Sequence, residues 1–447
     1  MATLISELHE RLGALEEQAQ RLDGYRQAIE GERPSAYLSR KSRDALDGSE
    51  LSRLGANYPR MLVRTYTDRL RLHGFRRSGS PADAQADTAA WERYRRAGLV
   101  PASDLVHADR LTYGQAFVTV WGTDGNPFRP VAVADSPLTM WAETDAAGNV
   151  LDALRRWQSG GYTHAVRYGT DAIRRYRARG YDVPAGFSGW ELVHATPNPF
   201  EIVPVTPFIR RTSSDDHSGT ALIADVLDLS DAVSKTLQDM IVTSEHTARP
   251  RRWATGLEIE EDEDGNIIDP FANDRKLQSE SPETKFGQLP PAGLDNYADM
   301  LTALLQQLGA VAGLPAHYLG TQGNEPPNAD SIRAAEAQLT TAALGEQRQL
   351  DAPWCRVAGF LAAVENPAET DPEDYAAGLE SVWGSPEVRT PAQAADAALK
   401  QQSIGIPLRT ILTDTLGYTP ESADGIVTAA RAESVARAAE QLGKLRP

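Results

Sequence analysis

The chain has 447 residues, of which 41% are hydrophobic and 24% charged, as is ordinary for a globular protein of two or three domains. It contains no apolar run of about eighteen residues, and its acidic N-terminus lacks the layout of a secretory signal, so we expect neither a membrane span nor export. A net charge of −17 argues against tight, static binding of nucleic acid. Because the chain has a single cysteine, Cys355, it can form neither an internal disulfide nor a cysteine metal cluster, which indicates that it folds in a reducing cytoplasm. We expect Cys355 to be a small buried side chain.

The first half of the chain is predicted to fold as helices followed by strands. Apolar residues at Ile5, Leu8, Leu12 and Leu15 predict a helix over residues 3–30. Further helical segments are expected at 59–71 and 88–113, and strands at 116–121, 131–133, 139–141, 151–158, 162–168, 172–176 and 190–194. These strands form a mostly antiparallel region laid on the preceding helices, which is an α+β pattern.

The region 219–312 reads as two helices that flank an insertion. The first helix, 219–246, carries one apolar stripe and an acidic face, and would be roughly 40 Å long. The insertion, 249–292, is rich in loop residues, with arginines at its start and an acidic run at 258–264. The second helix, 294–312, contains no lysine or arginine.

The last third is predicted to be mostly helical. Asn328 is a plausible N-cap for a helix over 329–350, and Pro353 is expected to kink or restart that helix. A short strand is expected at 380–384. Helical pieces follow over 391–443, with breaks at 405–407 and 417–420.

A search for catalytic or metal-binding motifs finds none. The chain has no P-loop, no Gly-x-Ser-x-Gly elbow, no His-Glu-x-x-His motif and no histidines at metal-ligand spacing. The acidic run 258–264 does not fit a calcium loop, so a solvated hairpin tip is favoured. Arg249, Arg251 and Arg252 either contact phosphate or, as we favour, oppose the negative end of a helix dipole. The segment 391–428 resembles a helix-turn-helix only weakly, because it lacks a basic recognition helix.

Four segments, in order along the chain, resemble the portal proteins of tailed phages, particularly those of actinobacteria. They are residues 25–76, which include YRQAIEGERPSAY and NYPR, residues 111–118 (LTYGQAFV), residues 310–320 (AVAGLPAHYLG) and residues 328–336 (NADSIRAAE). Each segment is moderately specific, and their shared order makes chance unlikely. The resemblance covers about residues 25–430.

The resemblance implies an α+β portal fold with a part-by-part map. The parts are an N-terminal helical arm (1–34), a wing (35–215), a stem helix (216–248), a loop-rich clip (249–292), a second stem helix (293–314), a tunnel loop (315–328), a tunnel helix with the return to the wing (329–390) and a helical crown (391–447). The resemblance also implies three groups of functional residues. On the stem, the residues expected to face the lumen are Asp228, Asp231, Lys235 and Asp239. In the tunnel loop they are Thr321, Gln322, Asn324, Glu325 and Asn328, and in the clip the residues expected to dock partners are Arg251, Arg252, Glu260, Glu261 and Asp262.

A portal is expected to be a non-enzymatic ring, a dodecamer, at one capsid vertex of the virion, assembled in the host cytoplasm. It passes double-stranded DNA and needs no cofactor or metal. Its expected partners are the terminase large subunit, a head–tail adaptor, and the major capsid and scaffold proteins, with no membrane. Two other classes stay open at this point: a cytoplasmic structural adaptor or scaffold, which would be a monomer or dimer, and an enzyme with an undetected site, which would gather perturbed titratable groups in one pocket.

Overall fold

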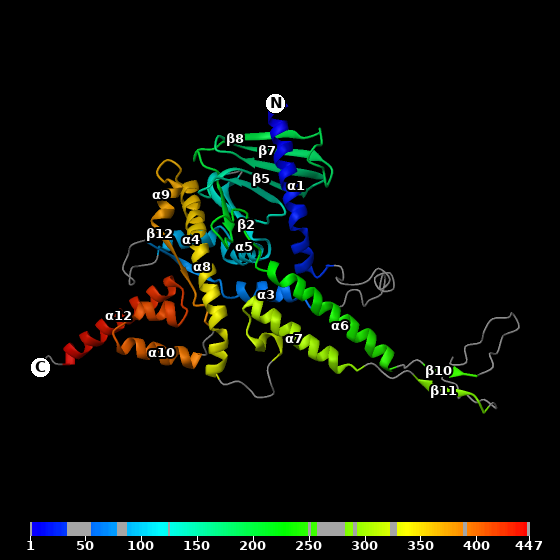
Figure 1. Ribbon diagram of the computed structural model, residues 1–447. Helices are drawn as coiled ribbons and strands as arrows, with labels where there is room; N and C mark the ends of the chain where they lie inside the picture. Colours follow the sequence, from blue (N-terminus) through cyan, green and yellow to red (C-terminus); the bar gives the residue numbers. More distant parts are fainter. Residues whose placement is uncertain are drawn as a thin grey trace.

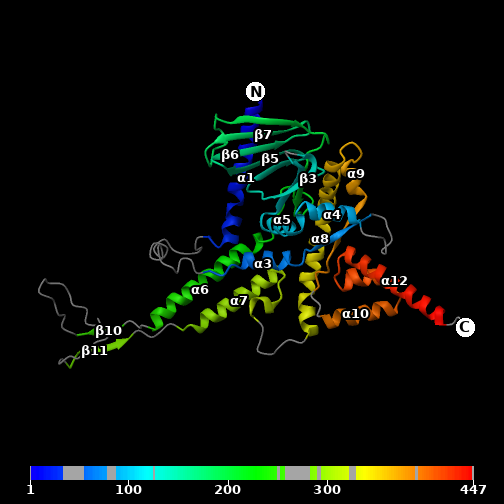
Figure 2. The same ribbon diagram turned by 180° about the vertical axis from the view of Figure 1, so that it is seen from behind.

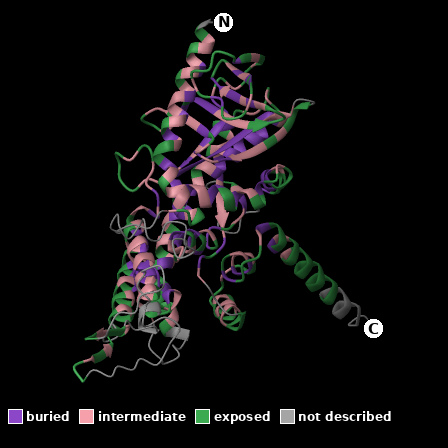
Figure 3. Cartoon of the chain, turned by 90° about the vertical axis from the view of Figure 1, so that its right-hand side faces the viewer, coloured by how far each residue is buried: buried purple, intermediate pink, exposed green. Residues whose placement is uncertain are grey.

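A computed structural model describes residues 2–33, 55–77, 87–123, 126–248, 252–256, 282–288, 293–321, 329–387 and 391–444 (Figure 1). A mixed helix and strand body lies at the centre. One pair of helices projects from it on one side, and a group of C-terminal helices projects on the other (Figures 1 and 2). Buried residues concentrate in the body, whereas the C-terminal helix is largely exposed (Figure 3).

The helices of the N-terminal part follow the predicted apolar spacing. Helix α1 (Ala2–Glu30) buries Leu8, Leu12 and Leu15 completely against one face of a sheet. The other helices are α3 (Tyr58–Thr67), α4 (Thr88–Arg96) and α5 (Leu99–Tyr113). Helix α3 ends four residues before the predicted end at 71, and the helical region 88–113 is interrupted between α4 and α5.

Two antiparallel sheets form the strand region, so the α+β class is confirmed. A three-stranded sheet has the order β3-β2-β9, and a five-stranded sheet is the meander β4-β5-β6-β7-β8. The strands are β2 (Gln115–Thr123), β3 (Asn126–Asp135), β4 (Met140–Thr144), β5 (Val150–Ser159), β6 (Tyr162–Tyr168), β7 (Ala172–Arg179), β8 (Glu191–Pro197) and β9 (Val205–Ile209). A core that includes Phe117, Ala153, Val166 and Val205 lies between the two sheets.

A separate two-stranded pair joins segments that are about 300 residues apart in sequence. Strand β1 (Leu72–Arg77) pairs with β12 (Leu379–Trp383), which confirms the strand predicted at 380–384. Strand β1 was not predicted, because its six residues include neither a valine nor an isoleucine. The short helix α9 (Pro372–Ala377) precedes β12.

Helix α8 (Ala329–Glu365) runs through the centre of the body as one helix of 37 residues, so the expectation that Pro353 restarts it is wrong. A proline inside a helix costs about 3 kcal/mol. Dense packing on both sides of Pro353 offsets this cost, since Leu350, Trp354 and Leu361 are fully buried. The indole Nε1 of Trp354 also donates to Nε2 of His107, at 3.0 Å.

The projecting pair consists of α6 (Leu227–Ala248), preceded by the one-turn helix η2 (Ala224–Val226), and α7 (Asp295–Ala312). The prediction that the first helix begins at 219 is wrong. Gly219 has φ +82° and lies against Gly114, and the Leu222 amide donates to the Leu111 carbonyl. These backbone contacts hold residues 219–222 against the end of α5 in a non-helical conformation.

The C-terminal group contains α10 (Pro391–Ser403), α11 (Leu408–Thr410), the π-helical turn η5 (Ile411–Thr415) and α12 (Pro420–Lys444). Its breaks fall at 405–407 and 417–420, as predicted. No helix in the part of the chain that the structure describes has the length and apolar character that a bilayer span needs.

Candidate functional site

The helices α6 and α7 lie side by side and carry a small strand pair at their far end (Figures 1 and 2). Leu308 and Ala312 of α7 enter the main core of the body, and Val233 of α6 is fully buried. Further out, the hydroxyl of Thr243 donates to the Tyr297 hydroxyl at 3.2 Å. The pair is therefore rooted in the body at one end only. We refer to α6 and α7 as the stem.

The acidic residues predicted for the stem have different surroundings. Asp228 is exposed. Asp231 is bound by Arg33, whose Nε and Nη2 atoms donate to its two carboxylate oxygens at 3.2 and 2.6 Å. Lys235 and Asp239 form an ion pair one helical turn apart. Two of the three predicted carboxylates are thus neutralised within the chain, and Asp228 is the one left open to solvent.

Helix α7 adds a surface of low charge. Its exposed residues include Asp295, Asp299, Gln306 and Gln307, and it contains no lysine or arginine. Together with Asp228, this surface is acidic to neutral. Such a surface offers no counter-ion to a phosphate backbone.

The far end of the stem carries strands β10 (Arg252–Thr255) and β11 (Lys285–Gln288), which pair antiparallel with Arg252 opposite Gln288. Arg252 is exposed, as are the large apolar side chains of Trp253 and Phe286. An isolated two-stranded ribbon is only marginally stable in water. Of the predicted docking residues, Arg251, Glu260, Glu261 and Asp262 lie outside the described residues.

A polar cluster links the three segments that meet at the base of the predicted tunnel loop. Arg69, just after α3, donates from Nη2 to the Tyr318 hydroxyl at 2.9 Å, and Tyr318 donates to Glu336 Oε1 at 3.2 Å. Glu336 also lies 3.6 Å from Nη2 of Arg69 and 3.6 Å from Nε2 of His317. The residues come from the segment after α3, the one-turn helix η4 (Ala316–Leu319) and the start of α8. We call Arg69, His317, Tyr318 and Glu336 the clasp.

The clasp brackets the predicted tunnel loop on both sides. Thr321, the first of its predicted residues, donates from its amide to the Ala316 carbonyl at 3.2 Å, which ends η4. Gln322, Asn324, Glu325 and Asn328 lie outside the described residues. Arg69 contacts Tyr318 before the loop and Glu336 after it. The clasp therefore holds the two segments that flank the predicted tunnel loop against the body.

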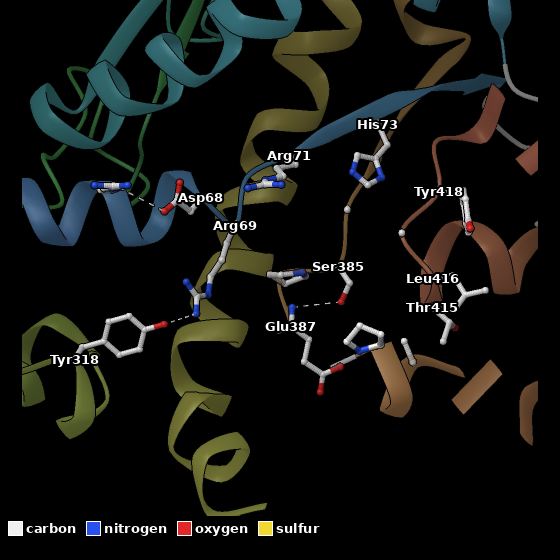
Figure 4. Close-up of a pocket in the computed structure, with 16 residues that line it drawn as sticks. Asp68, Arg69, Arg71, His73, Tyr318, Ser385, Glu387, Thr415, Leu416 and Tyr418 are labelled. Atoms are coloured by element: carbon white, nitrogen blue, oxygen red, sulfur yellow. Dashed lines mark hydrogen bonds and ion pairs between the residues drawn. The ribbon is translucent and has the colours of Figure 1, made fainter. Parts of the chain in front are cut away.

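Beside the clasp lies a cleft of about 960 Å³ between the body and the C-terminal helices (Figure 4). Figure 4 shows Arg69 reaching to Tyr318 on one side, while Leu416 and Tyr418 of the C-terminal group lie on the other. Burial and the neighbouring Arg71 guanidinium lower the pKa of His73, so this histidine is neutral at pH 7. The cleft separates the C-terminal helices from the body along this side.

The perturbed titratable groups do not gather in this cleft. Burial lowers the pKa of His107 to about 3, deep in the body core. Burial raises the pKa of Asp135 to about 6 against the attraction of Arg155, between the two sheets. Burial also raises the pKa of Cys355 to about 12, which fits the small buried side chain that was predicted. Among the described residues, no three histidine, cysteine or carboxylate side chains are placed to hold a metal ion.

Comparison with protein families shows to which family the chain belongs. The model of the phage portal protein family of the SPP1 Gp6-like type matches residues 14–441. The chain belongs to the phage portal protein family. The family match confirms the resemblance seen in the four sequence segments, and it extends beyond them to the N-terminal helix and most of the C-terminal group.

Two curated relatives carry the same family name. The chain is 28% identical over 361 residues to the portal protein of Mycobacterium phage L5, with 77% of this chain and 71% of the relative covered. It is 28% identical over 362 residues to the portal protein of Mycobacterium phage D29, with the same coverage. Both relatives come from phages of an actinobacterial host, as the sequence segments had indicated.

Solved structures of gene transfer agent particles are also similar. A chain of the virion of a native particle has a TM-score of 0.44 at 12% identity, and a chain from the neck of an empty particle has a TM-score of 0.45 at 13% identity. Each alignment covers 83% of this portal-family chain and 91% of the other chain.

Sequence reasoning missed the clasp and the partner of Asp231. Arg69 and Glu336 are separated by more than 260 residues, and Arg33 and Asp231 by 198. No local spacing signals such pairs. The sequence offered only an indirect signal for the clasp. His317 and Tyr318 lie within residues 310–320, one of the four segments that resemble portal proteins, where they are polar side chains among apolar ones.

Proposed function

We propose that copies of this chain assemble into a closed ring around an axial channel, and that the ring is the structural conduit for double-stranded DNA at one vertex of a phage capsid. The observation that carries the proposal is the portal family match over residues 14–441. In this proposal α6 and α7 are the stem, β10–β11 is the described part of the clip, 315–328 is the tunnel loop, and α10–α12 form the crown.

Exposed apolar side chains support assembly, because they occur on every part that projects from the body. They include Ile241, Met300 and Val311 on the stem, Trp253 and Phe286 on the β10–β11 ribbon, and Leu399, Ile404 and Leu408 on the C-terminal helices. A single chain leaves this surface in water. Identical neighbours arranged head to tail cover it on every copy, and such contacts close into a ring.

The charge of the stem supports passage rather than capture of DNA. Duplex DNA carries one negative charge per roughly 1.7 Å of its axis, and a basic wall would hold it. The stem instead presents Asp228, Asp295 and Asp299, while Asp231 is neutralised by Arg33. Rotational symmetry repeats these charges around the channel, so DNA meets a wall that repels it evenly.

The finer assignments belong to the same proposal. We propose a dodecamer in which Asp228, Asp231, Lys235 and Asp239 lie toward the lumen, and a clip that docks the terminase large subunit and later a head–tail adaptor. We propose further that the wing contacts capsid and scaffold proteins, and that the chain itself catalyses no reaction. The strongly perturbed groups His107, Asp135 and Cys355 are buried in the cores rather than exposed in a pocket, which supports the last point.

The experiment is mass photometry and negative-stain microscopy of the purified full-length protein. We expect one large closed species with an axial channel. A matched pair of variants tests the stem: Met300→Glu, on the stem, lowers the ring fraction, whereas Leu105→Glu, on body helix α5, leaves it unchanged. Both side chains are more than half exposed, so neither change disturbs the fold. Monomers or dimers alone, across a range of salt, would overturn the proposal and favour the adaptor.

A further inference from the structure

The wing contains a groove between its two sheets. The sheets pack against one another through the core that includes Phe117 and Ile173, and they separate toward the β2–β3 hairpin. Two adjoining cavities of about 580 and 390 Å³ lie where they separate. Both cavities are lined by Trp121, Gly122 and Arg175, so they form one continuous groove. We call this the wing groove.

Strand register places the basic and aromatic residues of one wall in two rows. Across β5 to β8, the first row is Arg155, Val166, Arg175 and His194, and the second is Trp157, His164, Arg177 and Glu191. Alternation along a strand puts both rows on the face opposite α1. The rings of Trp157 and His164 stack at 5.2 Å, and the Arg155 guanidinium lies 5.0 Å from the Trp157 ring.

The other wall is apolar. It comprises Trp121, Val131 and Val133 of the three-stranded sheet, with Phe128 at the tip of the hairpin. The Trp121 ring is held edge-on against Phe200 at 5.9 Å. Within the β2–β3 hairpin, a Cβ at Gly122 would lie 2.2 Å from the Pro127 carbonyl oxygen, so only glycine permits this close approach.

The groove is open to solvent and its lining has one sign of charge. Phe128 and Val193 are 57% and 54% exposed, respectively. The lining includes three arginines (Arg155, Arg175 and Arg177), two histidines (His164 and His194) and the phenols of Tyr168 and Tyr176, with no carboxylate among the lining residues. Arg155 is paired with the buried Asp135 behind it, and Arg177 only loosely with Glu191 at the rim, at 3.4 Å. This is unusual in a chain of net charge −17.

We propose that the wing groove binds an acidic, apolar peptide segment of a partner protein. Apolar side chains of the segment fill the space between Trp121, Phe128 and Val193. Its carboxylates face Arg155, Arg175 and Arg177. Carboxylates opposite arginines set orientation and partner choice, while the apolar contacts supply most of the affinity. A nucleic acid strand is disfavoured, because the apolar wall would desolvate its phosphates and the rest of the chain repels them.

The test uses the full-length protein, separated into ring and subunit fractions, and two fluorescein-labelled peptides measured by fluorescence anisotropy. One peptide alternates glutamate with leucine and phenylalanine, and the other has lysine in place of each glutamate. We expect the acidic peptide to bind both fractions and the basic peptide to bind at least about tenfold more weakly.

Matched variants locate the binding. Val193→Glu, in the groove, weakens the acidic peptide by about tenfold, and Leu105→Glu, an exposed apolar residue on α5, changes it less than about twofold. Arg177→Ala weakens binding, whereas Arg95→Ala does not, although Arg95 makes a similar exposed pair with Glu421 at 3.5 Å.

Four results would overturn the proposal. They are equal binding of both peptides, no binding of either, displacement of the acidic peptide by a short thymidine oligonucleotide, and binding to subunits but not to rings, which would mean that a second copy covers the groove. Ring formation is read from the separation of the fractions before any peptide is added, so failure of the proposed function is distinguished from failure of this proposal.

Discussion

At the residue scale, the body depends on a buried charge cluster between α5, β9 and α8. Arg110 and Glu346 are almost completely buried, and their side chains are 2.5 Å apart. Arg210 donates to the other Glu346 oxygen at 2.8 Å, and Gln349 accepts from Arg110 at 2.7 Å. Burial alone would raise the pKa of Glu346, but the two guanidinium groups outweigh it and the pKa is lowered.

We predict that Glu346→Ala lowers the free energy of unfolding by about 3–5 kcal/mol, because it leaves the buried Arg110 guanidinium and the partly buried Arg210 guanidinium without a counter-charge. Glu433→Ala, which removes an exposed pair with Arg437 on α12, changes it by less than about 1 kcal/mol. Urea denaturation of both variants measures the difference. Equal stability of the two variants would show that the cluster is dispensable.

The same carboxylate makes stability depend on pH. Since the folded-state pKa of Glu346 is depressed, its contribution to the free energy of unfolding is present above the unfolded pKa and is lost as pH falls through the lower folded value.

At the element scale, the stem begins at a point that backbone contact determines. Gly219 and Gly114 approach so closely that a Cβ on Gly219 would lie 2.1 Å from the Gly114 carbonyl oxygen. Both glycines have positive φ, and each ends or begins an element: Gly114 follows α5, and Gly219 precedes the turn into α6. The direction in which the stem leaves the body is therefore held by two residues without side chains.

For this junction, we predict that Gly219→Ala destabilises the protein by more than about 1 kcal/mol and lowers the yield of rings, because both the backbone angle and the space exclude a methyl group. Gly24→Ala is the control of opposite sign. Gly24 lies inside α1 with nothing near its Cβ position, so alanine stabilises the protein by up to about 1 kcal/mol. Thermal denaturation followed by mass photometry compares the two. A Gly219→Ala protein as stable as the original would mean that the junction relaxes freely.

At the scale of the whole molecule, self-repulsion opposes assembly. Each copy carries a net charge of −17, and the proposed ring brings the stems of neighbouring copies together. Screening changes this repulsion strongly, because the Debye length falls from about 30 Å at 0.01 M salt to about 8 Å at 0.15 M. Apolar contacts through residues such as Met300 and Trp253 are hardly affected by that change.

We therefore predict that the ring fraction rises as salt increases from about 0.01 to 0.15 M, as measured by sedimentation velocity. The double variant Asp295→Asn/Asp299→Asn removes two exposed charges from α7 and moves this transition to lower salt. Rings that dissociate as salt increases would contradict the prediction, since that behaviour would mean that ion pairs between copies hold the assembly.

Features that depend on local spacing could be predicted from the amino-acid sequence alone. The helix over 3–30, the meander of strands, the two stem helices around an insertion and the breaks near residues 405 and 417 all follow from periodicity or from glycine and proline, which act within a few residues. The portal resemblance was also visible, because four short segments kept their order. The residues expected to line the channel or to dock partners could be named only by that resemblance, and they stay predictions.

The tertiary structure decided what depends on contacts between distant segments. Helix α6 begins at 227 because residues 219–222 bond to α5 and β9, and α8 continues through Pro353 because the core holds it on both sides. The negative charge of Asp231 is offset only because the Arg33 side chain forms an ion pair with it. The clasp and the wing groove likewise combine residues whose proximity no local pattern encodes, since burial and charge pairing act through space rather than along the chain.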